Sequence, residues 1–344
     1  MLPATKALAG RAGAVPFKDV VVDNNDDGAA IPSQPAAEEY RDIVAALPSR
    51  LHGTPQRMRL YQGTWFREDW VLGFIAIQRH FVPREDGSDV VLASLPKCGT
   101  TWLKALVFAT AARAHPLLRL NPHDCIPFME AVYFAGDEAR LDAAPSPRLM
   151  STHASFTVLP ASITENPGCK IIYICRQPKD MLISFWHFIN RSKSNAMSFS
   201  DVWESIPKGT YFGSPIWEHI LEYWKASQEK PDKVLFLKYE EILRDPVKNV
   251  EKIAEFIGQP FSDVEKEAGI VESIIDLCSF QSLKASGANN AGFRRVVNVE
   301  VPNESFFRKG TVGDWVNYVT PEMAENLDNF LADKFRGSGF SFTK

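Results

Sequence analysis

The sequence predicts an α/β fold in which a central parallel sheet is covered by helices on both faces. Segments with helical periodicity alternate along the chain with short apolar runs typical of strands. One of these runs leads directly through a Lys-Cys-Gly-Thr-Thr loop into a helical segment, as in nucleotide-binding domains of the phosphate-binding-loop type. With 344 residues, 45% of them hydrophobic, the chain is long enough to bury the core of such a domain.

The individual elements follow from local patterns. Residues 1 to 36 are rich in Ala, Gly, Pro, Asn and Asp without a sustained period, which predicts a mobile N-terminal arm ahead of one domain at 37 to 344. Apolar residues at helical spacing predict helices at 38–47, 69–81, 100–114, 179–192 and 215–230. Short apolar runs predict strands at 88–95, 148–153, 169–176 and 233–240. Strand and helix alternation of this kind favours a parallel sheet buried on both faces.

The overall charge excludes some classes of partner. The 38 basic and 42 acidic residues give a formal net charge of -4, so nothing indicates a nucleic-acid surface or binding to an anionic membrane. The apolar runs are also much shorter than the roughly 20 residues that span a bilayer. Any site for an anion must therefore be local.

The cysteines indicate the compartment. Five of them are scattered along the chain, without a C-x-x-C pair or a histidine at zinc-ligand spacing. Disulfides are rare in the reducing cytosol, so a cytoplasmic location is the simplest expectation.

Residues 95 to 106, LPKCGTTWLKAL, contain the parts of a phosphate-binding loop in an unusual order. In a Walker A loop the lysine follows the last glycine, whereas here Lys97 precedes Gly99. Free backbone N–H groups at the start of the following helix, with the helix dipole, favour a bound anion. The alternative is an ordinary turn between a strand and a helix.

The chain shows no sign of a magnesium site. A metal-dependent nucleotide hydrolase or kinase needs an acidic residue at the end of a second strand, but the strand at 169–176 ends in Arg176. Asp180 lies where the next helix begins, so we interpret it as a capping carboxylate. We therefore expect the end of this strand to contribute to an anion site and not to a metal site.

Five motifs, in the same order along the chain, resemble those of the cytosolic sulfotransferases, and their spacing and residues are closest to the plant branch. They are LPKCGTTW, STH, ICRQPKDMLISFWHF, LKYEEILRDP and FFRKGTVGDW, and the resemblance covers roughly residues 58 to 335. Enzymes of this family use 3′-phosphoadenosine 5′-phosphosulfate (PAPS) as the sulfuryl donor and release 3′-phosphoadenosine 5′-phosphate (PAP). The resemblance therefore implies transfer of a sulfuryl group to an acceptor hydroxyl, without a metal.

The resemblance also implies which residues bind the donor. Lys97 reaches the oxygen that bridges phosphate and sulfonate, which explains its displaced position, because this oxygen is the leaving group. The neighbouring 5′-phosphate is held by Cys98, Gly99, Thr100 and Thr101, with Cys98 contributing only its backbone. The 3′-phosphate is bound by Arg176, Ser184, Arg308, Lys309 and Gly310, and the adenine lies against Trp102, Tyr239 and Phe280, with Cys278 at a position where relatives often have Thr.

His153, at the end of the second predicted strand, resembles the catalytic base of the family. The carboxyl ends of parallel strands share one edge of a sheet, so His153 is expected near Lys97. An ordinary imidazole pKa of about 6.5 suits removal of a hydroxyl proton at neutral pH. We interpret His187 and His219, on amphipathic helices, as structural.

The acceptor is less well defined by the sequence. Trp65, Phe128, Phe156 and Phe188 resemble, or lie beside, pocket positions of the family, and an aromatic wall suits a flat or hydrophobic alcohol or phenol. Flavonoids, steroids, hydroxyjasmonate and other alcohols stay open as acceptors.

Two departures from animal relatives are informative. Ser151 stands where those enzymes commonly have a lysine, which removes a second cation beside the sulfuryl group. Val316 and Pro321 interrupt their dimerisation motif, so a monomer or weak dimer is expected.

Two other functions compete with sulfuryl transfer. One is a metal-dependent kinase for a nucleoside or another small molecule, which the order of the loop and the strand ending in Arg176 disfavour. The other is a catalytically inactive nucleotide-binding module, which the presence of Lys97, Ser184 and His153 disfavours.

Overall fold

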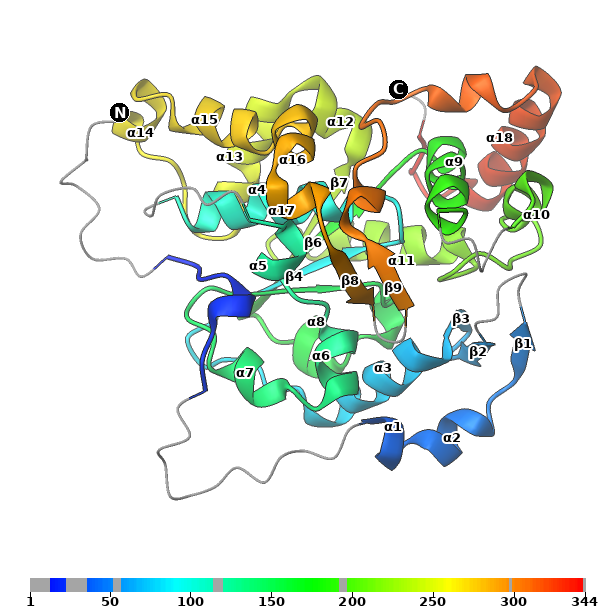
Figure 1. Cartoon of the computed structure of the whole chain (residues 1–344), viewed down its shortest axis with the longest axis horizontal. Helices are drawn as coiled ribbons and strands as arrows, with labels where there is room; N and C mark the ends of the chain where they lie inside the picture. The colour runs from blue at the N-terminus through cyan, green and yellow to red at the C-terminus, as the bar shows by residue number, and fades with distance from the viewer. Residues whose placement is uncertain are drawn as a thin grey trace.

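A four-stranded parallel sheet forms the centre of the protein (Figure 1). The computed structural model describes residues 13–22, 36–51, 57–113, 120–191, 197–296 and 299–342. The strand order is β5-β4-β6-β7, with β4 at Asp89–Ser94, β5 at Arg148–Thr152, β6 at Cys169–Cys175 and β7 at Val234–Lys238. The α/β class and the four sheet strands predicted from the sequence are confirmed.

The strand register aligns the carboxyl ends of the strands at one edge. Ala93 of β4 pairs with Thr152 of β5, and Ser94 pairs with Ile174 of β6. Cys175 at the end of β6 pairs with Lys238 at the end of β7. The residues that follow these strands therefore emerge side by side, although they are far apart in the sequence.

The two faces of the sheet support separate apolar cores, because successive strand residues point to opposite sides. Val90 and Leu92 of β4 pack in one core, whereas Val91 and Ala93 pack in the other. The Val90 side is covered by α4 (Thr100–Ala111), α13 (Pro246–Phe256) and α15 (Ile270–Leu277). The other side is covered by α3 (Glu68–His80), α6 (Met129–Ala135), α9 (Pro178–Ile189), α11 (Ile216–Glu229) and α18 (Pro321–Phe335). Figure 1 shows α4, α13 and α15 above the sheet and α3 and α6 below it.

Shorter elements complete the fold. An antiparallel sheet contains β1 (Ser49–Leu51), β2 (Arg57–Tyr61) and β3 (Thr64–Arg67), and a hairpin contains β8 (Phe293–Val296) and β9 (Val299–Pro302). The short α-helices are α1 (Ala36–Glu39), α2 (Arg41–Ala45), α5 (Pro122–Cys125), α7 (Glu138–Asp142), α8 (Ala161–Thr164), α10 (Phe199–Glu204), α12 (Tyr239–Arg244), α14 (Asp263–Glu267), α16 (Phe280–Ala285) and α17 (Gly287–Asn290). The 3₁₀ helices are η1 (Phe17–Asp19), η2 (Phe156–Val158), η3 (Asn303–Phe306) and η4 (Asp314–Asn317).

Part of the predicted N-terminal arm packs on the domain. Arg140 of α7 donates hydrogen bonds to the carbonyl oxygens of Phe17 and Val20, and its guanidinium lies 4.4 Å from the centre of the Phe17 ring. Residues 13–22 are thus anchored, where the sequence predicts mobility. Residues 1–12 and 23–35 of the predicted arm lie outside the described residues.

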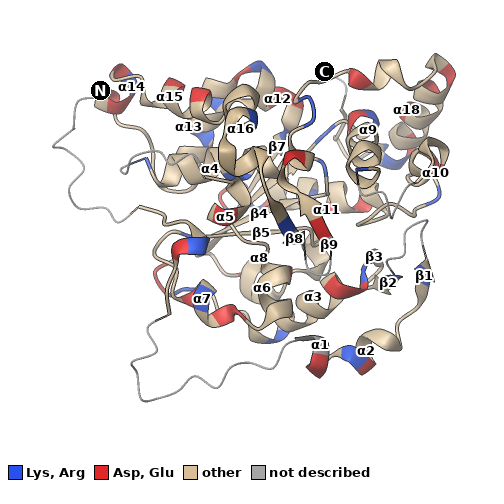
Figure 2. Ribbon diagram, in the orientation of Figure 1, with Lys and Arg blue, Asp and Glu red and all other residues tan. Residues whose placement is uncertain are grey.

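Positions of basic and acidic residues are interspersed along the helices on both sides of the sheet (Figure 2). None of the helices in the described segments has the length and apolar character needed to cross a membrane.

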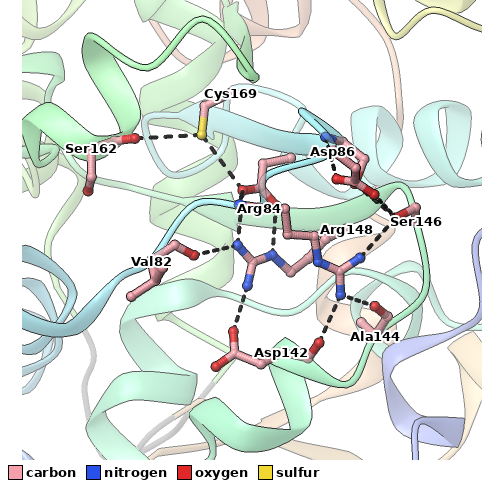
Figure 3. A network of polar contacts seen from close by, with 11 residues as sticks. Val82, Arg84, Asp86, Asp142, Ala144, Ser146, Arg148, Ser162 and Cys169 are labelled. Carbon is pink, nitrogen blue, oxygen red and sulfur yellow. Dashed lines mark hydrogen bonds and ion pairs between the residues drawn. The ribbon is translucent and has the colours of Figure 1, made fainter.

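A buried ion pair holds the amino-terminal end of the central strand. Arg148 of β5 donates to both carboxylate oxygens of Asp89 of β4, at 2.7 and 2.9 Å. Figure 3 shows the same guanidinium between Asp142 and the carbonyl group of Val82, to which it also donates. This network ties β4 and β5 together at the edge opposite the loop that follows β4.

This network predicts a large difference between two matched substitutions. The Asp89 side chain is 1% exposed, so Asp89→Asn removes the buried carboxylate that pairs with Arg148, leaves only the mostly exposed Asp142, and should lower the free energy of unfolding by about 3 to 5 kcal/mol. Asp142 contacts the same arginine, but its side chain is 61% exposed, so Asp142→Asn should cost less than about 1 kcal/mol. Urea unfolding of both variants measures the difference, and equal losses would contradict this account.

Candidate active site

A cavity of about 830 Å³ opens at the carboxyl edge of the sheet. Its lining comes from the loop after β4, the ends of β5 and β6, α9, α12, α16 and the segment after η3. It brings together most of the residues predicted from the sequence, namely Lys97, Gly99, Thr100, Thr101, Trp102, Phe128, His153, Arg176, Ser184, Phe188, Tyr239, Phe280, Arg308, Lys309 and Gly310.

Four predicted side chains lie elsewhere. Cys98 is buried with its sulfur 3.5 Å from that of Met181, and Cys278 lines a second cavity behind α4. Trp65 lies under the guanidinium of Arg50, at 3.9 Å, and Phe156 packs edge to face with Tyr223. Trp65, Phe156 and Cys278 are therefore not among the residues that line this cavity.

The loop after β4 brings its backbone close to the cavity. Gly99 precedes the first turn of α4 with φ of 102°, and a Cβ atom there would lie 2.7 Å from the Tyr239 ring. Helix α4 begins at Thr100, so the unpaired N–H groups of its first turn are directed toward this end of the cavity. The Thr100 hydroxyl lies 2.6 Å from Ser94 Oγ, which leaves Thr101 as the hydroxyl on the cavity side.

Lys97 lies among other cations. Its Nζ is 3.9 Å from the centre of the Phe188 ring. Burial, together with the charges of Arg176, Arg191 and Arg308, lowers the pKa of Lys97 from its usual value to about 7. A bound anion would relieve this repulsion and stabilise the ammonium form.

The other end of the cavity combines aromatic rings with cations. The Arg176 guanidinium lies 4.5 Å from the centre of the Tyr239 ring and donates to the carbonyl oxygen of Thr311. Its Nε is buried and has no hydrogen-bond partner among the described residues. A Cβ atom at Gly310 would lie 2.5 Å from the Phe280 ring, so this glycine allows the chain to pass against the aromatic wall. The aromatic rings offer faces for stacking on a planar ring, and the unpaired Nε of Arg176 offers a donor for an anion beside it.

Asp314 organises the cations of the FFRKG segment. It forms ion pairs with Arg308 and Lys309. Burial opposes ionisation of Asp314, but hydrogen bonds from these two side chains and from Asn317 lower its pKa to about 2. Arg308 is therefore held in place while it lines the cavity.

Asp180 acts differently from the prediction. Gln177, not Asp180, caps α9 by accepting from the backbone N–H of Lys179. The Asp180 carboxylate instead accepts from the N–H groups of Gly313 and Trp315, at the start of η4. It is a cap, as expected, but of a distant 3₁₀ helix whose position fixes the Arg308 segment. The described residues contain no group of three or more His, Cys, Asp or Glu side chains suited to a metal ion.

His153 is held at each polar atom except Nε2. Its backbone N–H donates to Glu130, its carbonyl lies 3.4 Å from the ring of His219, and its Nδ1 lies 2.7 Å from the carbonyl oxygen of Ser94. A carbonyl can only accept, so Nδ1 carries the hydrogen and Nε2 keeps a lone pair. Nε2 has no hydrogen-bond partner in the described segments, and His153 lines the cavity.

The surroundings of His153 change its expected basicity. Trp70 stacks on the imidazole at 5.1 Å, and Phe128 lies at 4.7 Å. Burial is the largest cause of a pKa lowered to about 3, partly opposed by the Ser94 hydrogen bond and reinforced by Lys104. The ordinary value of about 6.5 assumed from the sequence is therefore wrong for the free protein.

Several cavity residues were not identified from the sequence. Trp70 and Phe212 line the region around His153, and Phe306 lies beside Lys97 and His123. Phe306 was within reach of sequence reasoning, because it begins the FFRKG motif. Ser151 donates to the carbonyl oxygen of Pro127 and provides no cation, as the sequence indicates.

Comparison with known proteins gives the family. The model of the sulfotransferase domain matches residues 87–339. Cytosolic sulfotransferase 8 of Arabidopsis thaliana is 40% identical over 313 residues, covering 88% of this chain and 93% of the relative. Cytosolic sulfotransferase 14 of the same plant is 39% identical and covers 88% and 90% of the two chains.

Solved structures agree with this result. The crystal structure of an Arabidopsis thaliana sulphotransferase has 35% identity and a TM-score of 0.69, and the match covers 89% of this chain and 96% of that one. Mouse sulfotransferase SULT7A1, solved in complex with PAP, has 29% identity and a TM-score of 0.62, with coverage of 82% and 95%.

The family match and the plant relatives identify a transferase for sulfuryl groups. The chain belongs to the sulfotransferase family and is similar to the cytosolic sulfotransferases of plants. The cytoplasmic location expected from the sequence agrees with the names of these relatives.

The environment of His153 predicts a specific titration behaviour. Because its pKa is lowered to about 3, the imidazole should stay neutral, with hydrogen on Nδ1, from pH 8 down to pH 5. Imidazole ¹⁵N chemical shifts measure both properties, and loss of a signal in His153→Gln assigns it. A titration midpoint near pH 6.5, or hydrogen on Nε2, would show that the ring is not buried as described.

Proposed function

We propose that this protein transfers the sulfuryl group of PAPS to a hydroxyl group of a small, largely hydrophobic acceptor. The observation that carries the proposal is that the unpartnered Nε2 of His153 and the ammonium group of Lys97 share one cavity. A base for the incoming hydroxyl and a cation for the leaving oxygen are the two groups that such a transfer requires. The PAP complex of mouse SULT7A1 supports PAPS as the donor.

The donor fits the two ends of the cavity. The first turn of α4 and Thr101 would hold the 5′-phosphate, beside Lys97. Arg176, with its unpaired Nε, and Ser184 and Arg308 would hold the 3′-phosphate. The adenine would lie between Trp102, Tyr239 and Phe280.

The reaction we propose is an in-line displacement. His153 Nε2 accepts the proton of the acceptor hydroxyl as its oxygen forms a bond to sulfur. The bond from sulfur to the bridging oxygen breaks, and its electron pair stays on that oxygen, which Lys97 stabilises. The products are the sulfated acceptor, PAP and a proton on His153, which returns to solvent.

The acceptor half of the cavity is aromatic. Trp70, Phe128, Phe188 and Phe212 line it together with His153, so a flat or hydrophobic alcohol or phenol would fit beside the base. Flavonoids, steroids and hydroxyjasmonate all satisfy this description.

We also propose a monomer or a weak dimer. Val316 is exposed, and so is Pro321 at the start of α18, so the two residues that depart from the animal dimerisation motif both lie at the surface.

The proposed function predicts transfer of ³⁵S-labelled sulfuryl from PAPS to hydroxylated aromatic and alicyclic acceptors. Activity should persist in EDTA, because Lys97, Arg176 and Arg308 would balance the charge of the donor. A panel of phenols and alcohols, assayed with and without EDTA, makes this measurement, and ATP labelled at its γ-phosphate is the comparison. Phosphoryl transfer from ATP, or sulfuryl transfer abolished by EDTA, would contradict the proposed metal-independent sulfuryl transfer.

Substitution of the two catalytic residues should have different effects. His153→Ala should lower kcat by about 10² to 10⁴, the usual loss for a general base, while PAP binds within a few-fold of the wild type. Lys97→Ala should lower kcat and also weaken the binding of PAP, because the ammonium group of Lys97 would contact the nucleotide in the ground state. Stopped assays and titration calorimetry measure the two effects.

Acidity of the acceptor provides the control for this pair. Phenols of lower pKa need less help in losing a proton, so they should partly restore turnover in His153→Ala but not in Lys97→Ala. Identical responses of both variants to a phenol series would contradict the assigned roles.

A further inference from the structure

A buried lysine lies directly behind the phosphate-binding loop. Lys104 is in the second turn of α4 and is fully buried. Its Nζ donates to the carbonyl oxygen of Ile126 at 2.8 Å, contacts Nδ1 of His123 at 3.2 Å, and lies 3.6 Å from the centre of the Phe128 ring. A carbonyl, an imidazole nitrogen and an aromatic face together match the three N–H groups of an ammonium ion.

The charge of Lys104 decides the tautomer of His123. Burial, and then the charge of Arg294, lowers the pKa of Lys104 well below its usual value, whereas Glu130 and the face of the Phe128 ring favour the ammonium form. The ammonium form has only donors, so in that form Nδ1 of His123 accepts from Lys104 and Nε2 carries the hydrogen. The Nε2 atom lies 3.0 Å from Oγ1 of Thr101, to which it therefore donates. Burial, and then the charge of Lys104, lowers the pKa of His123 well below its ordinary value, so the ring remains neutral.

With this tautomer, the Thr101 hydroxyl can act toward a ligand only as a hydrogen-bond donor. It accepts from His123, and its own hydrogen has no acceptor among the described residues. Thr101 lines the cavity in the first turn of α4, so this hydrogen is free to point toward an anion there. By contrast, the Thr100 hydroxyl is engaged with Ser94.

We propose that Lys104 and His123 are positioning residues that turn the hydroxyl of Thr101 into a dedicated donor to the 5′-phosphate of the nucleotide. This chain of hydrogen bonds runs from Lys104 Nζ through the two nitrogens of His123 to Thr101 Oγ1, and each hydrogen bond polarises the next. This inference rests on the proposed function, because that function places the 5′-phosphate at Thr101. In its ammonium form Lys104 would also be a cation behind the loop, whereas Ser151 supplies none from β5.

The test compares two nucleotides that differ only in the 5′-phosphate. Lys104→Met should lower the affinity for PAP about tenfold, which is the effect of losing one hydrogen bond to a charged group. It should change the affinity for adenosine 3′-phosphate less than twofold. In a Thr101→Val background the same substitution should change PAP affinity less than twofold, because the hydroxyl on which it acts is absent. Titration calorimetry on the single and double variants measures this coupling.

Lys170→Met is the matched control. Lys170 also donates to a backbone carbonyl and lies over a phenylalanine ring, both of Phe256, but near the amino-terminal end of β6. Lys170→Met should leave the affinities for PAP and for adenosine 3′-phosphate unchanged. If Lys104→Met does not fold, His123→Phe breaks the same chain while keeping a ring between Phe128 and Phe306, and the same losses are expected.

The outcomes separate the inference from the proposed function. Equal losses for PAP and adenosine 3′-phosphate, or a loss that persists in the Thr101→Val background, would overturn the positioning role alone. A wild-type protein that binds PAP no more tightly than adenosine 3′-phosphate would overturn the proposed 5′-phosphate site, and the positioning role with it.

Discussion

The parallel pairing of β4 with β5 and β6 is the constraint on which the site depends. It places the ends of three strands at one edge, so that Lys97, His153 and Arg176 emerge as neighbours although about 80 residues separate the first from the last. The pairing itself is anchored at the opposite edge, where Arg148 joins β5 to Asp89 of β4. A shift of β5 along β4 would break that buried ion pair and would move His153 relative to the loop. The buried ion pair and the site therefore depend on the same strand register.

The cavity concentrates positive charge in a protein whose formal net charge is -4. Burial, and then repulsion from Arg176, Arg191 and Arg308, lowers the pKa of Lys97 to about 7, so the charged form of Lys97 is costly in the free protein. Asp314 offsets part of it by pairing with Arg308 without entering the lining of the cavity. The arrangement leaves the positive potential directed at the cavity, where a doubly phosphorylated nucleotide would use it.

The sequence predicts the central sheet well because its strands are buried on both faces and read as continuous apolar runs. It does not predict β8 and β9, since FRRV and VEVP are short and partly polar, and their pairing depends on the tertiary contacts that cover the cavity. The positions proposed for the donor follow from motifs in a fixed order. Trp65 lies away from the cavity because aromatic character alone does not reveal direction: on β3, Phe66 is buried in the core and Arg67 lines the cavity. Lys104 and His123 lie 19 residues apart on different helices, and their contact is visible only after folding.

The low pKa of His153 connects the base to the donor. The ring is neutral with its lone pair on Nε2 because burial and nearby cations disfavour the imidazolium ion, and Ser94 fixes the hydrogen on Nδ1. A base with a pKa of about 3 is always in the correct protonation state at neutral pH but is weak. Negative charge from a bound donor would raise that pKa, since an opposite charge nearby favours the protonated form. The imidazole would therefore become a stronger base when the sulfuryl group is present, whereas burial and the charges of Lys104 and Arg67 keep it a weak base in the free protein.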